Sequence, residues 1–149
     1  MPRSPRSTRA EYPYLLEIPT RWSDNDVYGH VNNVVYYSFF DTLVNQFLIK
    51  NSVLDINDGD LIGLVVETNC QYFAPVAFPK TIVGGLRTAH IGNSSVRYEI
   101  GVFDGGNEAI AEGFFVHVYV DRQTRKPTPL PAPLRATLET IAKVHNPET

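Results

Sequence analysis

Cysteine is almost absent from this sequence, in which Cys70 stands alone. An internal disulfide is therefore excluded, and we expect Cys70 to be a buried free thiol in a reducing compartment, the cytoplasm. No segment approaches the roughly 18 consecutive apolar residues of a membrane-spanning helix. The basic, Ser- and Pro-rich start is not followed by the apolar segment of a secretory signal. We expect neither export nor a membrane partner.

An excess of positive charge is also lacking. The formal net charge is −3, so the surface as a whole does not attract a phosphate backbone, and nucleic acid is excluded as an expected partner. Histidine is scarce as well, with 4 residues, and none of them stands in a metal-ligand spacing such as HExxH. We therefore assign no metal.

The length and composition are those of one globular domain. The chain has 149 residues, of which 43% are hydrophobic and 19% charged, which is enough apolar material for a packed core. We expect residues 1–12 to form a flexible tail and residues 13–149 to form a single domain.

Hydrophobic periodicity predicts the order of the secondary-structure elements. A short strand at 14–19 is followed by a polar loop and then by a helix at 34–50. The period then changes to two, and turns rich in Gly and Asn separate successive strands. The predicted strands after the helix are 64–72, 81–91, 95–103 and 108–121, and a short closing helix is predicted at 134–144.

The long helix is predicted to be buried around most of its circumference. Its apolar side chains occupy too many sides for ordinary one-face packing, and either Asn32 or Asn33 is placed to cap its start. An antiparallel sheet wrapped around one central helix, an α+β fold, satisfies this pattern. The apolar residues are Tyr36, Phe39, Phe40, Leu43, Val44, Phe47 and Leu48.

The loop before this helix concentrates the chemically active side chains. Residues 21–33 read RWSDNDVYGHVNN, with two carboxylates and one histidine just ahead of the helix start. The first amides of a helix are unpaired and carry partial positive charge, so they stabilise a developing oxyanion. Asp26 is placed to fold back beside them, and Gly29 permits a close approach of backbone and substrate.

This loop, followed by VVYYSFFD, resembles the signature of the 4-hydroxybenzoyl-CoA thioesterase-like family of the hotdog superfamily. The resemblance extends over nearly the whole domain. It implies a hotdog fold and hydrolysis of an acyl-CoA or acyl carrier protein thioester, with coenzyme A as part of the substrate and no cofactor. It also implies a homodimer or homotetramer.

The resemblance further implies roles for single residues. Asp26 would attack the thioester carbonyl or activate water, and the backbone amide of Asn33 would polarise the carbonyl oxygen. Asp24 would be structural. Ser94 and Ser95 would either meet the pantetheine arm or only complete a turn. The expected substrate-binding residues are Gly29, His30, Asn32, Ser94 and Ser95.

Two other functions stay open at this point. A hotdog enoyl-CoA hydratase would use an Asp-x-Asn-Pro-aliphatic-His run, which this loop lacks because no proline lies between Asp24 and His30. A non-catalytic acyl-CoA-binding module would bind the same ligand without turnover. Glu67 and Glu112 are candidates for a second catalytic acid, although a solvent-facing position on a strand is the simpler interpretation.

Overall fold

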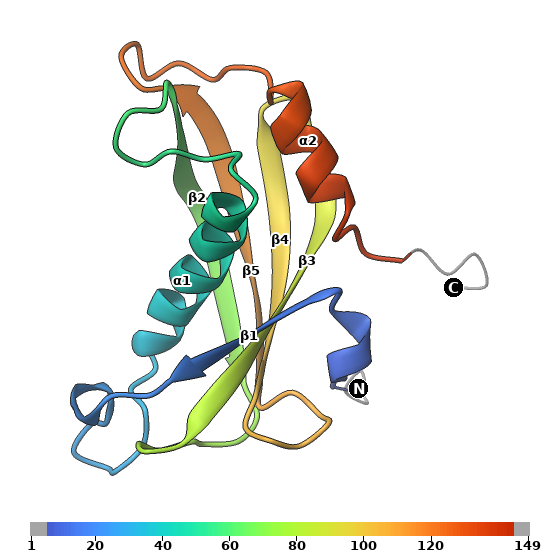
Figure 1. Cartoon of the computed structure of the whole chain (residues 1–149). Coiled ribbons are helices and arrows are strands. Elements are labelled where there is room, and N and C mark those ends of the chain that lie inside the picture. The colour runs from blue at the N-terminus through green and yellow to red at the C-terminus, as the bar shows by residue number, and fades with distance from the viewer. Residues whose placement is uncertain (1–5, 145–149) are drawn as a thin grey trace.

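The computed structural model describes residues 6–144 and contains a five-stranded antiparallel sheet with two helices on one face (Figure 1). The strand order across the sheet is β1-β3-β4-β5-β2. The expected hotdog arrangement of a sheet around a long helix is confirmed. The elements are η1 (Arg9–Glu11), β1 (Tyr14–Pro19), η2 (Trp22–Asp24), α1 (Val35–Lys50), β2 (Leu61–Tyr72), β3 (Thr81–Ile91), β4 (Ser95–Phe103), β5 (Ala111–Asp121) and α2 (Ala132–Glu139).

The α1 helix packs against the face of the sheet that we call the inner face. All seven apolar residues predicted to be buried are buried, and they form the core together with inner-face residues of the strands. A polar stripe along the helix stays exposed in the single chain. That stripe comprises Ser38, Asp41, Thr42 and Gln46. Neither helix within residues 6–144 is long and apolar enough to cross a membrane.

The bounds of four elements differ from the prediction, in that α1 starts one residue later, at Val35, and α2 starts two residues earlier, at Ala132, besides the differences that follow. The β2 strand starts at Leu61 and contains a bulge between Val65 and Glu67, where the expected unbroken alternation stops. The β5 strand starts later, because the chain before it binds the N-terminal segment through a bond from the amide of Ala109. The α2 helix ends early, because the backbone that follows it pairs with Thr88 of β3.

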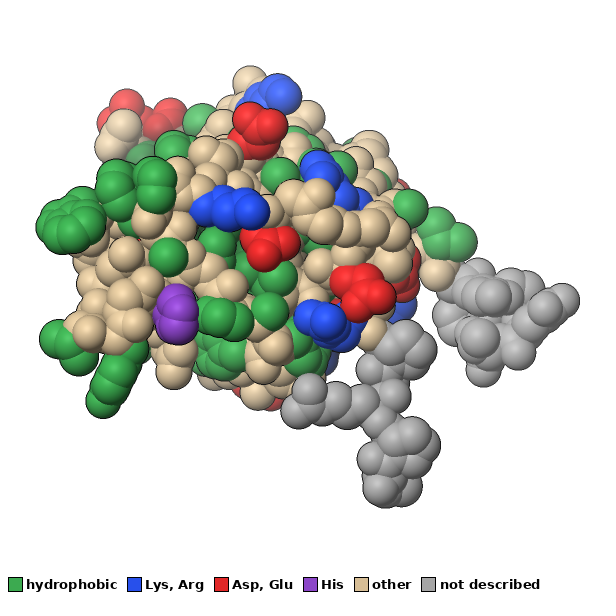
Figure 2. Space-filling model, turned by 90° about the horizontal axis from the view of Figure 1, so that it is seen from below, with side chains coloured by type: hydrophobic (Ala, Val, Ile, Leu, Met, Phe, Trp, Pro, Cys, Tyr) green, Lys and Arg blue, Asp and Glu red, His purple; other side chains and the backbone are tan. Residues whose placement is uncertain are grey.

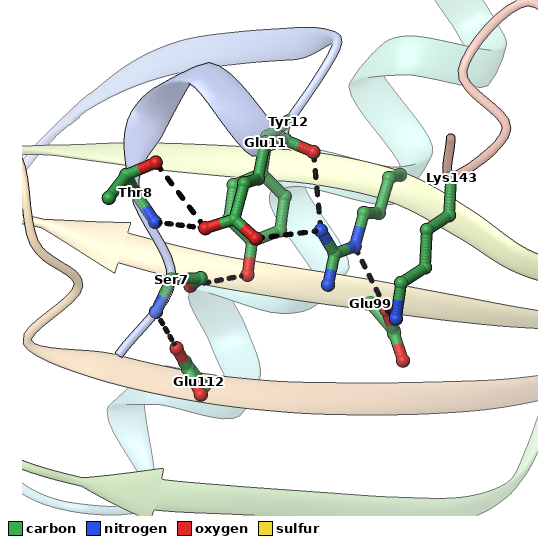
Figure 3. Close-up of polar contacts among 8 residues, drawn as sticks. Ser7, Thr8, Glu11, Tyr12, Glu99, Glu112 and Lys143 are labelled. Carbon is green, nitrogen blue, oxygen red and sulfur yellow. Dashed lines mark hydrogen bonds and ion pairs between the residues drawn. The ribbon is translucent and has the colours of Figure 1, made fainter. Parts of the chain in front are cut away.

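The opposite, outer face of the sheet carries the N-terminal segment (Figure 3). Ser7 and Tyr12 are both buried, and their hydroxyl oxygens lie 2.9 Å apart. The Tyr12 ring rests on Gly85 and Gly101, where an added Cβ would lie 2.7 Å from ring atoms, and the guanidinium carbon of Arg87 lies 4.8 Å from the ring centroid. Residues 7–12 are therefore packed, in contrast to the expected flexible tail, while residues 1–5 of that tail lie outside the described residues.

Candidate active site

The loop between β1 and α1 is anchored by a buried carboxylate. Asp24 is 2% exposed, and its side chain accepts a hydrogen bond from the backbone N–H of Arg21 at 2.7 Å and one from the Arg21 guanidinium at 2.9 Å. Its own carbonyl oxygen accepts from the amide of Asn32 at 2.8 Å. Asp24 therefore ties the beginning of the loop to its end, as expected for a structural residue.

The loop is also fixed to the segment that precedes β3. The side-chain oxygen of Asn25 accepts from the amide of Phe78 at 3.1 Å, and the amide of Val31 donates to the carbonyl of Val76 at 2.8 Å. The Trp22 ring lies edge-on to the Phe78 ring, with centroids 5.9 Å apart. These long-range contacts hold the Asp26 turn in one position relative to the helix.

Asp26 lies at the start of a tight turn in which one of its two carboxylate oxygens accepts a hydrogen bond. Its Oδ1 accepts from the amide of Tyr28 at 2.9 Å, and the amide of Gly29 donates to its carbonyl oxygen at 3.0 Å. Gly29 has a φ of +81°, a left-handed conformation that glycine adopts without strain. Within the described part of the chain, the other carboxylate oxygen accepts no hydrogen bond. Asp26 is therefore oriented by its own turn while one oxygen stays available.

The start of α1 leaves one amide without an acceptor. The amides of residues 31, 32, 34, 35, 36 and 37 all donate to acceptors in the chain. The Asn33 amide between them has no acceptor among residues 6–144, and the residue is exposed. The N-cap residue of α1 is Val34 and not either asparagine, and the side-chain oxygen of Asn32 accepts from the amide of Val34 at 3.0 Å. A lone free N–H at a helix start is suited to binding an anionic oxygen.

An open depression of about 730 Å³ lies along the Asp26 loop and extends as far as Asn32. Its lining includes Asp26 and Asn32, the residue before the free amide. Three of its other lining side chains are apolar and strongly exposed, namely Trp22 at 78%, Val27 at 93% and Tyr28 at 84%. Figure 2 shows hydrophobic side chains protruding at this end of the molecule. The carboxylate thus borders a hollow with an apolar rim.

The remaining predicted residues divide into two groups. Gly29 lines the same depression, and His30 is exposed in the same loop, where its carbonyl oxygen accepts from the amide of Asp26 at 2.9 Å. Ser94 and Ser95 do not lie near this depression. Ser95 pairs with Val118 of β5, whereas the helix start contacts Tyr72, which pairs with Ala111.

The seven residue steps along β5 from Ala111 to Val118 correspond to about 23 Å at about 3.3 Å per residue. Within one chain the two serines thus lie at the opposite end of the sheet from Asp26. There the carbonyl of Ser95 accepts from the amide of Gly92 at 2.7 Å, which closes the β3–β4 turn. Their predicted contact with substrate requires either an extended ligand or a second copy of the chain.

Other titratable residues fall outside the site. Glu112 lies on the outer face, where its carboxylate accepts from the amide of Ser7, and Glu67 shares that face by register. His117 is 4% exposed on the inner face beside Phe115, and burial lowers its pKa to about 4. Cys70 is only partly buried, contrary to expectation. Within residues 6–144 no three His, Cys, Asp or Glu side chains lie together as metal ligands would.

Sequence reasoning missed Tyr72, whose hydroxyl donates to the carbonyl oxygen of Asn33 at 2.9 Å. It also missed the apolar rim of the depression. The apolar rim could have been predicted from the aromatic residues Trp22 and Tyr28, which flank the Asp-x-Asp pair in an otherwise polar loop. No local signal pointed to Tyr72, because it lies 39 residues further along the chain.

Comparison with known proteins matches residues 20–138 to the family described as the thioesterase-like superfamily. The PA5185 protein of Pseudomonas aeruginosa strain PAO1 is 52% identical, with a TM-score of 0.92 over 95% of this chain and 100% of that one. A thioesterase from Thermus thermophilus, solved with coenzyme A and Zn, is 28% identical, with a TM-score of 0.72 over 87% and 94% of the two chains.

The fold is also that of Slr0204, a 1,4-dihydroxy-2-naphthoyl-CoA thioesterase from Synechocystis. That protein is 18% identical, with a TM-score of 0.76 over 84% of this chain and 94% of that one. The matched family region starts just before the Asp26 loop and includes α1, all the later strands and most of α2. The chain therefore belongs to the thioesterase-like superfamily.

Proposed function

We propose that this protein hydrolyses the thioester of an acyl-CoA or of an acyl carrier protein, releasing a free acid and a thiol. The observation that carries the proposal is the unpaired amide of Asn33, which directly follows Asn32 in the chain. Asn32 lines the same hollow as Asp26, whose carboxylate has one oxygen without a hydrogen bond among the described residues. Family membership supports thioester hydrolysis as the general chemistry. The roles of single residues and the acyl-CoA substrate are our inference.

The proposed reaction uses two groups. The thioester oxygen accepts a hydrogen bond from the Asn33 amide, which stabilises the negative charge that develops as the carbonyl is attacked. Asp26 either attacks the carbonyl carbon itself, giving a mixed anhydride that water then hydrolyses, or removes a proton from the attacking water. In both routes the thiolate leaves and is protonated. One oxyanion donor typically contributes about 10²–10³-fold, and general-base help about 10²–10⁴-fold.

The apolar rim supports an apolar acyl group as the part of the substrate next to the thioester. Trp22, Val27 and Tyr28 line the hollow that holds Asp26, and a hydrocarbon or aromatic acyl group would cover them. His30 and Gly29 of the same loop are proposed to complete this binding surface. The proposed chemistry needs no cofactor, because a carboxylate and an amide suffice for a thioester.

We also propose that the working unit is a homodimer or homotetramer. The β2 strand lies at one edge of the sheet and exposes Leu64, Val65 and Val66. An apolar strand with an unpaired edge is a template for pairing with another chain. A second copy would also allow Ser94 and Ser95 to meet a substrate bound at Asp26.

The test is release of free thiol from a panel of acyl-CoAs, read with a thiol reagent. We expect turnover by the wild type and a loss of at least about a hundredfold in Asp26→Asn. The control Asp58→Asn makes the same chemical change in an exposed loop and should leave the rate unaltered. Hydration of crotonyl-CoA without thiol release would favour a hydratase instead, and binding without either product would favour a binding module.

A further inference from the structure

Tyr72, the last residue of β2, connects the sheet to the start of α1. Its hydroxyl donates to the carbonyl oxygen of Asn33 at 2.9 Å. Its ring lies edge-on to Tyr36, with centroids 5.0 Å apart and planes at 87°. Tyr36 is 2% exposed in the first turn of α1, so the Tyr72 ring rests against a fixed part of the core.

The bond from Tyr72 is the shorter of two that hold the Asn33 carbonyl. The other comes from the amide of Tyr36 at 3.3 Å, which lies beyond the usual N–H···O range. It is a bond between residues three apart, the tighter 3₁₀ type that is common at helix ends and has poorer geometry. Removing the Tyr72 hydroxyl would leave the Asn33 carbonyl with this long bond alone.

The Asn33 N–H belongs to the same planar peptide group as the Asn32 carbonyl, and this group is joined through the Cα of Asn33 to the next one, which carries the Asn33 carbonyl. The carbonyl of the preceding peptide, that of Asn32, is bound by the amide of Val35 at 2.9 Å. The carbonyl of the following peptide, that of Asn33, is the one bound by Tyr72. Both flanking carbonyls are therefore restrained, one from within the helix and one from the sheet.

We propose that Tyr72 is a positioning residue that, by holding the Asn33 carbonyl, directs the Asn33 N–H at the oxygen of a bound thioester. This inference rests on the proposed function. Burial raises the pKa of Tyr72 above its usual range, so the hydroxyl remains a donor at every pH at which the protein would work. Tyr72 does not itself touch the reacting atoms in this role, and its effect passes through the backbone of Asn33.

Tyr72→Phe tests this inference because it removes the hydroxyl and keeps the ring against Tyr36. We expect kcat to fall about tenfold, less than the 10²–10³-fold of losing a complete oxyanion donor, while KM changes by less than about twofold. The matched control is Tyr14→Phe. Tyr14 is a half-buried tyrosine packed on Phe47, and within the described chain its hydroxyl has no hydrogen bond. This control should keep the wild-type kcat.

A second measurement follows the Asn33 amide itself by ¹⁵N-edited NMR, without substrate. In Tyr72→Phe we expect a shifted Asn33 amide signal and faster hydrogen exchange at that amide. If the wild type hydrolyses thioesters and Tyr72→Phe has the same kcat, the inference is overturned. A change in Tyr72→Phe that affects only KM would overturn it as well. If the wild type hydrolyses no thioester, the proposed function fails, and an unmoved Asn33 signal would then reject the positioning role independently.

Discussion

Replacing Asp24 by alanine should both destabilise the protein and slow its reaction, although Asp24 is not proposed to touch substrate. The buried carboxylate accepts from the Arg21 backbone at 2.7 Å and from the Arg21 guanidinium at 2.9 Å. A hydrogen bond to a charged group contributes about 1.5–3 kcal/mol. The Arg21 side chain is 70% exposed, so water screens the ion pair to below about 1 kcal/mol.

The free energy of unfolding should therefore fall by about 2–3 kcal/mol, most of it from the backbone bond. For a domain of this size each kcal/mol corresponds to about 3–4 °C in Tm, so calorimetry should record a decrease of about 6–12 °C. The kcat for thiol release should fall as well, because the Asp24 side chain holds the short η2 turn in place, and the backbone carbonyl of that turn accepts from the amide of Asn32.

Two comparison variants make this reasoning refutable. Arg21→Ala removes only the screened ion pair and keeps the backbone donor, so it should lower Tm by less than half as much as Asp24→Ala. Asp26→Asn should leave Tm within about 2 °C, because an amide oxygen can still accept the single bond from Tyr28. If Asp24→Ala keeps the wild-type Tm, or if Arg21→Ala is equally destabilising, the backbone bond does not anchor the loop.

Two further predictions concern the rim and the core. The double change Trp22→Ala and Tyr28→Ala should raise KM about tenfold for long-chain or aromatic acyl-CoAs and little for acetyl-CoA. Equal increases in KM for both kinds of substrate would show that these two side chains do not contact the acyl group. Burial lowers the pKa of His117 from 6.5 to about 4, so its contribution to stability is complete above pH 6.5 and is lost as the pH falls toward 4. Urea unfolding should show a decline of about 3 kcal/mol over this range that His117→Phe removes.

The fold was largely predictable because the strongest signals in the sequence are local. The bounds of β1, β3 and β4 match the predicted ranges, and the seven buried residues of α1 are those named from helical spacing. Alternation and glycine-containing turns are properties of neighbouring residues, so one sequence suffices to find them. The packing of the N-terminal segment was not predicted, because the two glycines that the Tyr12 ring contacts belong to β3 and β4, which are far from Tyr12 in the sequence.

The site was predictable in part. The cluster in residues 21–33 and the free amide of a helix start follow from local rules, but the choice of Asn33 came from the family resemblance. Spacing alone does not reveal which groups accept from the amides on either side of Asn33. The amide of Asn32 donates to the backbone carbonyl of Asp24, and the amide of Val34 donates to the side chain of Asn32. The place of Ser94 and Ser95 was not predictable, because it depends on which end of the sheet a hairpin occupies.

The bulge in β2 has a consequence for the helix start. Before it, Gly63 and Val65 face α1, and after it Cys70 and Tyr72 do, so the facing positions change from odd to even numbers. If β2 kept all its residues but paired without the bulge, every later residue would move one position along β5 and face the opposite side of the sheet. Gln71 would then pair with Ala111 and face the helix start while Tyr72 faced the outer side, so the bulge decides which side chain reaches Asn33.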